Sequence, residues 1–171
     1  MNPLRTYDYL TIARGKVFDR VRPLSAEQYA REFPIGPGTL GRTLTHIMIC
    51  EWFYVQRIEE RAVPPYEKWP IQDEKPPAFA VLEETWTRQA EQTRASLEAV
   101  RDWEDVIEYA ALTSDDPPSI ITASAADLFT QLVLHEVHHR AQALNMLRQL
   151  GVAMKDDIDF NALMYTRRKG W

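Results

Sequence analysis

Four long segments of this chain repeat their apolar residues at the spacing of an α-helix, and proline or glycine separates them. The first covers residues 4–21, where apolar side chains recur every three or four positions until Pro23 closes the segment. By the same test the others cover residues 39–63, 79–100 and 124–151. Helices of this length bury their apolar faces against one another. The pattern therefore predicts an all-α fold, a four-helix bundle formed by a single domain of residues 1–171.

Shorter elements are expected between these segments. They are a short helix with a capping box at Ser25 and Gln28, a turn at 34–38, a polar proline-bearing loop at 64–77, a small β-hairpin formed by 106–109 and 120–122, a turn within it at 114–118, and one or two helical turns at 159–168. Ser124 and Asp127 are cap signals at the start of the fourth long helix, and Gly151 is a natural end for it.

Composition excludes several classes of protein. Apolar residues make up 45% and charged residues 26% of the 171 positions, which is ordinary for a soluble globular protein. The formal net charge of -5 argues against nucleic acid as the main partner. The single cysteine, Cys50, excludes an internal disulfide framework and fits a reducing compartment. With no apolar signal core and no membrane-length stretch, we expect a cytoplasmic protein without a membrane partner.

Three histidines carry the chemical information. His46 lies in LTHIMICEWFY, and His135 and His139 lie in LVLHEVHHRAQ, although the whole chain has only four histidines. Residues four apart on a helix lie about 40° apart on one face. Two imidazoles placed in this way can bind one metal ion, and a third from another helix can complete an open site.

The spacing also predicts that these histidines face the interior. Residues 128, 132, 135, 139, 142 and 146 follow the 4-3-4-3-4 spacing of a helix seam, and Thr43, His46, Cys50 and Phe53 form a similar line. A neutral nitrogen buried on such a seam without a partner would cost about 1–3 kcal/mol, and a shared ion would satisfy several at once. The residues therefore predict a metal site formed by His46, His135 and His139.

Neighbouring residues leave alternatives open. His138 is about 100° from His139, so it is expected to flank the site and not to bind the ion. Cys50, one turn after His46, is either a fourth ligand that would close a structural site or a small buried apolar residue. Gln142 could orient a ligand histidine or a water. Arg140 could neutralise an anionic substrate, although an ordinary surface salt bridge is the simpler interpretation.

Residues 135–139 also match the metalloprotease motif His-Glu-x-x-His, with Glu136 in the position of the general base. Such enzymes need a third ligand downstream and a strand that binds substrate. The fourth helix continues to Gly151 without another ligand, so a protease is disfavoured.

The segments LTHIMICEW (44–52), LHEVHHRAQ (134–142) and DIDF (157–160) resemble the DinB/YfiT-like family of metal-dependent enzymes over essentially the full length. Ala141 stands where the family often has glycine. The resemblance implies an up-down-down-up bundle, a homodimer, and a divalent ion, zinc or nickel, held by His46, His135 and His139. Members with known activity are thiol-dependent transferases or isomerases that use bacillithiol, mycothiol or glutathione.

These observations lead to one main functional hypothesis and two alternatives. The main hypothesis is an S-transferase-type enzyme that activates a small-molecule thiol at a three-histidine metal site. The first alternative is a metal-dependent hydrolase that activates water at the same open position. The second is a non-catalytic, stress-associated metal-binding or dimeric scaffold protein, which a site closed by Cys50 would favour.

Overall fold

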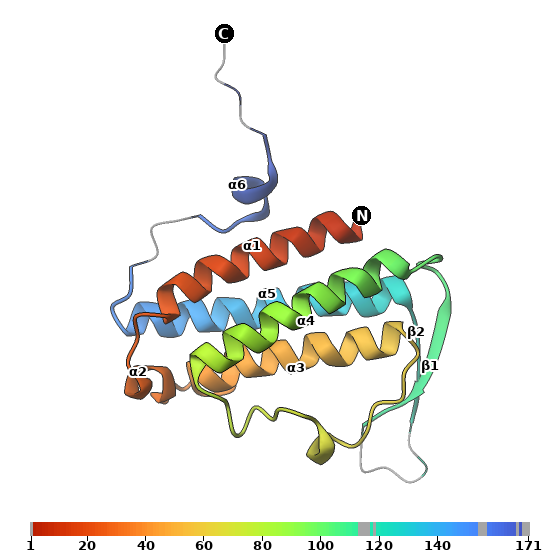
Figure 1. The fold of residues 1–171 in the computed structure, drawn as a ribbon, viewed down its shortest axis with the longest axis horizontal. Helices are drawn as coiled ribbons and strands as arrows, with labels where there is room; N and C mark the ends of the chain where they lie inside the picture. The colour runs from red at the N-terminus through yellow and green to blue at the C-terminus, as the bar shows by residue number, and fades with distance from the viewer. Residues whose placement is uncertain (1, 113–116, 118, 154–156, 167, 169–171) are drawn as a thin grey trace.

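The computed structural model describes residues 2–112, 117, 119–153, 157–166 and 168. Its frame is a bundle of four long helices, which are α1 (Pro3–Val21), α3 (Leu40–Ile58), α4 (Phe79–Ala99) and α5 (Ala125–Gln149). In Figure 1, α1 and α5 run in one direction and α3 and α4 run in the other, which confirms both the all-α class and the up-down-down-up order. Because α3 and α4 are parallel, the loop between them returns along the length of the bundle and contains the 3-10 helix η1 (Tyr66–Lys68).

The helix ends follow local chemistry that the sequence displays. Ser124 and Asp127, the predicted cap signals, form a capping box at the start of α5, and Gly151 follows the helix with a φ of 78°, a conformation that glycine adopts without steric cost. The short helix α2 (Ala26–Ala30) likewise begins at a capping box. Helix α3 ends at Ile58 and not near residue 63, because the chain turns at Glu60, whose φ is 54°.

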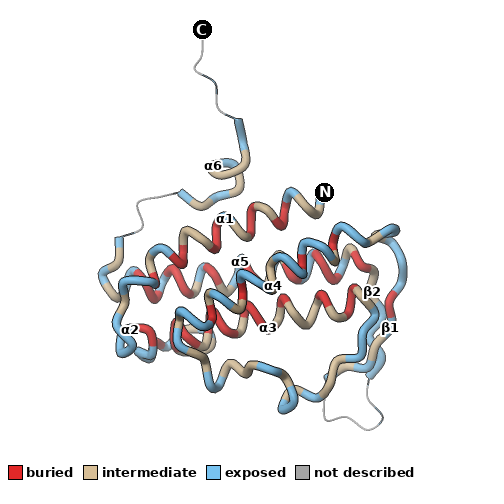
Figure 2. Tube along the Cα trace, in the orientation of Figure 1, coloured by how far each residue is buried: buried red, intermediate tan, exposed pale blue. Residues whose placement is uncertain are grey.

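The apolar core is divided into two clusters along the bundle axis. One cluster lies near the α2 end and includes Leu44, Met48 and Met146. The other lies near the hairpin end and includes Leu10 and Phe129. Figure 2 shows buried residues along the sides of the long helices that face one another. A polar site can therefore lie inside the bundle, at the helical turns between the two clusters, without disrupting the apolar packing.

The predicted hairpin is present. Strand β1 (Val106–Ala110) pairs antiparallel with β2 (Ile120–Ser124), and Val106 lies opposite Ser124. Of the turn predicted at 114–118, only residue 117 is among the described residues. The C-terminal helical turn is α6 (Phe160–Met164), which is shorter than the predicted 159–168. The ring of Phe160 packs edge-on against Tyr9 of α1, with 5.1 Å between the ring centroids. None of the helices in the described parts of the chain is both long enough and apolar enough to cross a membrane.

Candidate metal centre

The three histidines selected from the sequence converge between α3 and α5. The Nε2 atoms of His46 and His135 are 3.1 Å apart. The His139 ring centroid is 4.7 Å from that of His46 and 4.4 Å from that of His135. The three rings therefore lie close together between two adjacent helices.

Hydrogen bonds on the far side of two rings fix their orientation. His46 Nδ1 lies 2.8 Å from Asp73 Oδ2, and His139 Nδ1 lies 2.8 Å from Gln142 Oε1. Both partners are acceptors, so each Nδ1 carries the proton that it donates. The Nε2 atoms of His46 and His139 are then unprotonated. This arrangement, in which the other ring nitrogen donates to a carboxylate or carbonyl, accompanies almost every histidine that binds a metal in proteins.

Asp73 contacts the cluster from a position that the sequence did not indicate. It lies in the irregular loop between α3 and α4, where no helical period places a side chain, and the only sequence signal is an acidic pair with Glu74. The Tyr66 hydroxyl contacts Asp73 Oδ1, and the Asp73 backbone N–H donates to that hydroxyl at 3.1 Å. Burial alone would raise the pKa of Asp73, but the bonds from Tyr66 and His46 hold it below its ordinary value. An ionised carboxylate is therefore held against His46.

Cys50 lies close enough to take part. Its Sγ is 3.9 Å from His46 Nε2, and the ligand atoms of His46, Cys50 and His135 all lie within 4.8 Å of one another. Burial, and then the charge of Asp73, raise the pKa of the Cys50 thiol to about 12, so without an ion it is protonated at neutral pH. The ligand atoms gathered in this way are those of His46, Cys50 and His135, and His139 adjoins the group through its ring without belonging to it.

His138 occupies a different place. It is exposed on α5, and its Nε2 accepts from Gln142 Nε2 at 3.0 Å. Gln142 thus bridges His138 and His139 through the two ends of its amide. His138 flanks the cluster, as its angular position on the helix predicted.

The cluster fits a divalent ion chemically. Two nitrogens that each lie about 2.0–2.1 Å from one zinc ion would be separated by roughly 2.9–3.4 Å, and the observed Nε2 separation is 3.1 Å. Burial, followed by the three neighbouring imidazoles, lowers the pKa of His135 to about 3. The ring is therefore neutral at physiological pH, which is the form that binds metals.

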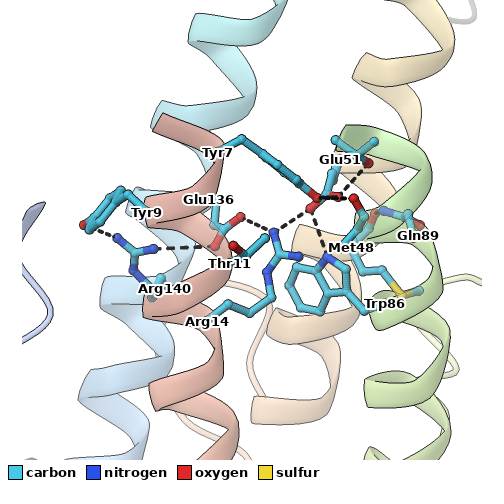
Figure 3. A network of polar contacts seen from close by, with 12 residues as sticks. Tyr7, Tyr9, Thr11, Arg14, Met48, Glu51, Trp86, Gln89, Glu136 and Arg140 are labelled. Carbon is cyan, nitrogen blue, oxygen red and sulfur yellow. Dashed lines mark hydrogen bonds and ion pairs between the residues drawn. The ribbon is translucent and has the colours of Figure 1, made fainter. Parts of the chain in front are cut away.

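Beneath the histidines lies a network of buried charges (Figure 3). Arg14 of α1 is placed between two carboxylates: its Nη2 is 2.6 Å from both Glu51 Oε2 and Glu136 Oε2. Glu51 also accepts hydrogen bonds from Tyr7, Thr93 and Trp86 at 2.8–2.9 Å. The network therefore joins α1, α3, α4 and α5 at the level between the two apolar clusters.

This network corrects two expectations. The deepest positions in the middle of α5 belong to Glu136 and Arg140, at 2% and 5% exposure, whereas His135 and His139 are half-buried at the edge of the core. Arg140 is not a surface salt bridge, since it pairs with Glu136 at 3.5 Å and donates to the Tyr9 hydroxyl at 2.6 Å. The charges satisfy one another there, so this face of the helix need not be apolar.

The network of buried charges also holds in place the helical turns that carry the clustered side chains. Glu51, Glu136 and Arg140 directly follow Cys50, His135 and His139 in the chain. Successive helical residues point about 100° apart, so each turn presents one side chain to the cluster and the next to the core. The Glu136 carboxylate is bound to Arg14 and Arg140, which removes the free general base that the His-Glu-x-x-His interpretation requires.

A cavity of about 470 Å³ lies between α3 and α4, with Trp52, Gln56 and Ser96 among its lining residues. None of the three clustered histidines lines it. The lining residues Trp52, Val55 and Glu59 lie about 120–180° from His46 around α3, so this cavity is separate from the histidine cluster.

The fold and the cluster define a class: a four-helix bundle with converging histidines on facing helices, an arrangement in which bundles hold metal ions. The sequence matches the DinB family profile over residues 1–167, and the chain belongs to that family. Comparison with curated proteins gives no match.

Two solved structures are similar in fold. One is a DinB-like protein from Bacillus cereus ATCC 10987, with a TM-score of 0.62, 18% identity, and coverage of 88% of this chain and 92% of the other. The second is the DinB-like protein YjoA from Bacillus subtilis, with a TM-score of 0.62, 17% identity, and coverage of 87% and 94%. At these identities the similarity concerns the fold alone.

Proposed function

We propose that this protein is a metal-dependent enzyme that binds a divalent ion, zinc or nickel, through His46, His135 and His139. The observation that carries the proposal is the convergence of the His46 and His135 Nε2 atoms at 3.1 Å, with the opposite nitrogen of His46 tied to Asp73. The His139 ring lies beside the other two, and its Nδ1 is held by Gln142, which supports it as the third ligand.

The reaction we propose is the transfer of a small-molecule thiol to an electrophile. A divalent ion lowers the pKa of a thiol as it lowers that of water, which supplies thiolate at neutral pH. The S–H bond breaks and its proton passes to solvent, a bond forms from sulfur to the electrophilic carbon, and the leaving group departs with its electron pair. The role of the chain is to orient the three rings through Asp73 and Gln142, and to hold their helices through the buried network.

A fluorogenic conjugation assay tests this activity. Protein loaded with zinc or nickel is incubated with 2-mercaptoethanol and monobromobimane, and the rate above the protein-free background is measured. We expect turnover that the His135→Ala variant loses. His138→Ala is the matched control, because it removes a histidine from the same helix outside the cluster, and it should keep the activity. Equal rates with and without metal would refute the mechanism.

A second candidate is a structural metal site that only stabilises the bundle, and the proximity of Cys50 to His46 favours it. Replacing Cys50 with alanine separates the two. In an open catalytic site, ion stoichiometry and conjugation persist in the variant, whereas in a closed structural site the ion is lost or binds far more weakly. Turnover of an ester without any thiol would point instead to a hydrolase.

We further propose a homodimer with a small-molecule substrate as its partner. Sedimentation equilibrium of the metal-loaded protein measures the mass directly. A mass of one chain at micromolar concentration would contradict the dimer without affecting the proposed chemistry.

A further inference from the structure

One buried arginine in the described structure lacks the counter-charge that the others have. Arg14, Arg57 and Arg140 are each less than 9% exposed. Arg14 and Arg140 pair with carboxylates in the network. Arg57 is 8% exposed, forms no ion pair with any described carboxylate, and its buried Nε has no hydrogen-bond partner among the described residues. A buried polar group without a partner is costly, so the unpaired Nε suggests that a ligand supplies an acceptor to this guanidinium.

Arg57 lies on the histidine side of α3. At about 100° per residue, His46, Cys50, Phe53 and Arg57 fall within roughly 60° of one another, so they form one line along the helix. The Arg57 guanidinium carbon is 5.1 Å from the centre of the Phe53 ring, one turn nearer to the N-terminus. The side chain therefore extends back toward the histidine cluster, as long side chains in helices do.

Aromatic rings connect the two points. Tyr54 lies edge-on to His135 at 6.1 Å, and Phe53 is 5.3 Å from Tyr54. On the other side of Arg57, the Tyr109 ring of β1 lies 4.4 Å from the guanidinium carbon. These rings are each half-buried, and together they form a series of ring contacts from His135 to Arg57.

We propose that Arg57 binds a carboxylate of the molecule that reacts at the histidine cluster, while the neighbouring aromatic rings contact its apolar part. This inference rests on the proposed function and names the class of its substrate: a small anionic molecule whose reacting atom and carboxylate are separated by several bonds. Cys50 and Arg57 are seven residues apart, which is about 10 Å along a helix, and the separation is shorter than this because the Arg57 side chain extends back to Phe53. The carboxylate belongs either to the thiol or to the electrophile.

Packing against two rings is the competing explanation for Arg57. A cation over an aromatic face is stabilised by about 0.5–2 kcal/mol, which offsets part of the cost of burial without any ligand. The two explanations differ in one measurable respect. Only a ligand site makes the protein discriminate between an acid and its neutral ester.

The first arm of the test asks whether the thiol carries the carboxylate. The dissociation constants of S-methylglutathione and its diethyl ester are measured by calorimetry with the metal-loaded protein, because the methylated sulfur cannot react. We expect the acid to bind about ten- to hundredfold more tightly than the ester, the range for a charge-assisted hydrogen bond, and we expect Arg57→Gln to abolish the difference. Arg88→Gln, which removes an exposed arginine from α4, should preserve it.

The second arm asks whether the electrophile carries the carboxylate. Conjugation of 2-mercaptoethanol to 4-(bromomethyl)benzoate and to its methyl ester is compared in the wild type and in Arg57→Gln. For each compound the wild-type conjugation rate is divided by the variant rate, so the intrinsic reactivity of the compound cancels. A loss of about tenfold or more for the acid, with the ester unaffected, assigns the carboxylate to the electrophile.

The outcomes separate this inference from the proposed function. A preference for the acid over the ester that depends on Arg57 supports the Arg57 site, and the arm in which it occurs identifies the molecule that carries the carboxylate. Equal binding of the acid and the ester in the first arm, together with equal rate enhancements over the protein-free background for the acid and the ester in the second, overturns it in the wild type alone. If 2-mercaptoethanol is still conjugated to monobromobimane in that case, the proposed function stands. Absence of all conjugation, with Arg57-dependent binding of S-methylglutathione retained, would instead refute the transferase and leave the anion site.

Discussion

Replacing Arg14 with methionine leaves two buried carboxylates without their shared cation. Arg14 Nη2 is 2.6 Å from both Glu51 Oε2 and Glu136 Oε2, and its guanidinium carbon is 4.0 Å from the centre of the Trp86 ring. Methionine fills a similar volume against that ring, so the loss is mainly electrostatic. Removing one partner of a buried ion pair costs about 3–5 kcal/mol. For a chain of this length each kcal/mol lowers Tm by about 2–4 °C, so we expect Tm to fall by about 6–20 °C.

The dependence on pH gives this prediction a second test. Burial raises the pKa of Glu136 above its ordinary value, and the variant no longer has Arg14 to oppose that effect. A carboxyl whose pKa is raised on folding adds stability below its unfolded pKa and loses that contribution as pH rises through the folded pKa. The difference between variant and wild type should therefore be smallest near pH 4 and grow toward pH 8.

Urea unfolding at both pH values, together with calorimetry, measures the effect. Arg22→Met is the control, because Arg22 also connects α1 to α4, through Glu83, but at the surface. It should shift Tm far less than Arg14→Met does. A loss of less than about 1 kcal/mol for Arg14→Met, or the same loss at pH 4 and pH 8, would refute the argument that the buried carboxylates depend on this cation.

Three further predictions concern the cluster. Asp73→Ala should weaken metal binding by about ten- to hundredfold while the helical circular dichroism stays unchanged, since it removes the acceptor that orients His46; unchanged affinity in a competition titration would count against that role. Gly36→Ala should lower stability by about 1–2 kcal/mol, because Gly36 has a φ of 53°, and should weaken metal binding as Gln142→Ala does, because the new Cβ would lie 2.1 Å from Gln142 Oε1, the acceptor for His139. Full metal affinity in Gly36→Ala would contradict this coupling. Metal at 100 times its dissociation constant should stabilise the protein by about 2.7 kcal/mol in thermal scans, and a chelator should reverse that shift.

Much of the bundle was predictable because its signals are local. The helical repeat of apolar residues located all four long helices, and the Ser124 capping box and Gly151 marked the two ends of α5. The histidine cluster was predictable for the same reason. His135 and His139 share one helix face by spacing alone, and His46 lies on an apolar helix that packs beside theirs.

The residues that hold the histidines in place could not be predicted from local patterns. Asp73 reaches His46 from an irregular loop, and no period relates the two positions. Glu51, Glu136 and Arg140 interrupt apolar faces in sequence, so they are easily assigned to the surface. Their burial depends on Arg14, which is 37 residues from Glu51 and 122 from Glu136 along the chain. Long-range charge pairing of this kind leaves no periodic trace.

The most direct test of the central claim is metal stoichiometry by equilibrium dialysis against zinc and elemental analysis. The variants are alanine substitutions of His46, His135 and His139, with His138→Ala as the control on the same helix as two of them. The account predicts one ion per chain in the wild type and in His138→Ala, and binding at least tenfold weaker in each of the other three. A wild type that retains no ion, or a His46→Ala variant that binds as tightly as the wild type, would contradict it.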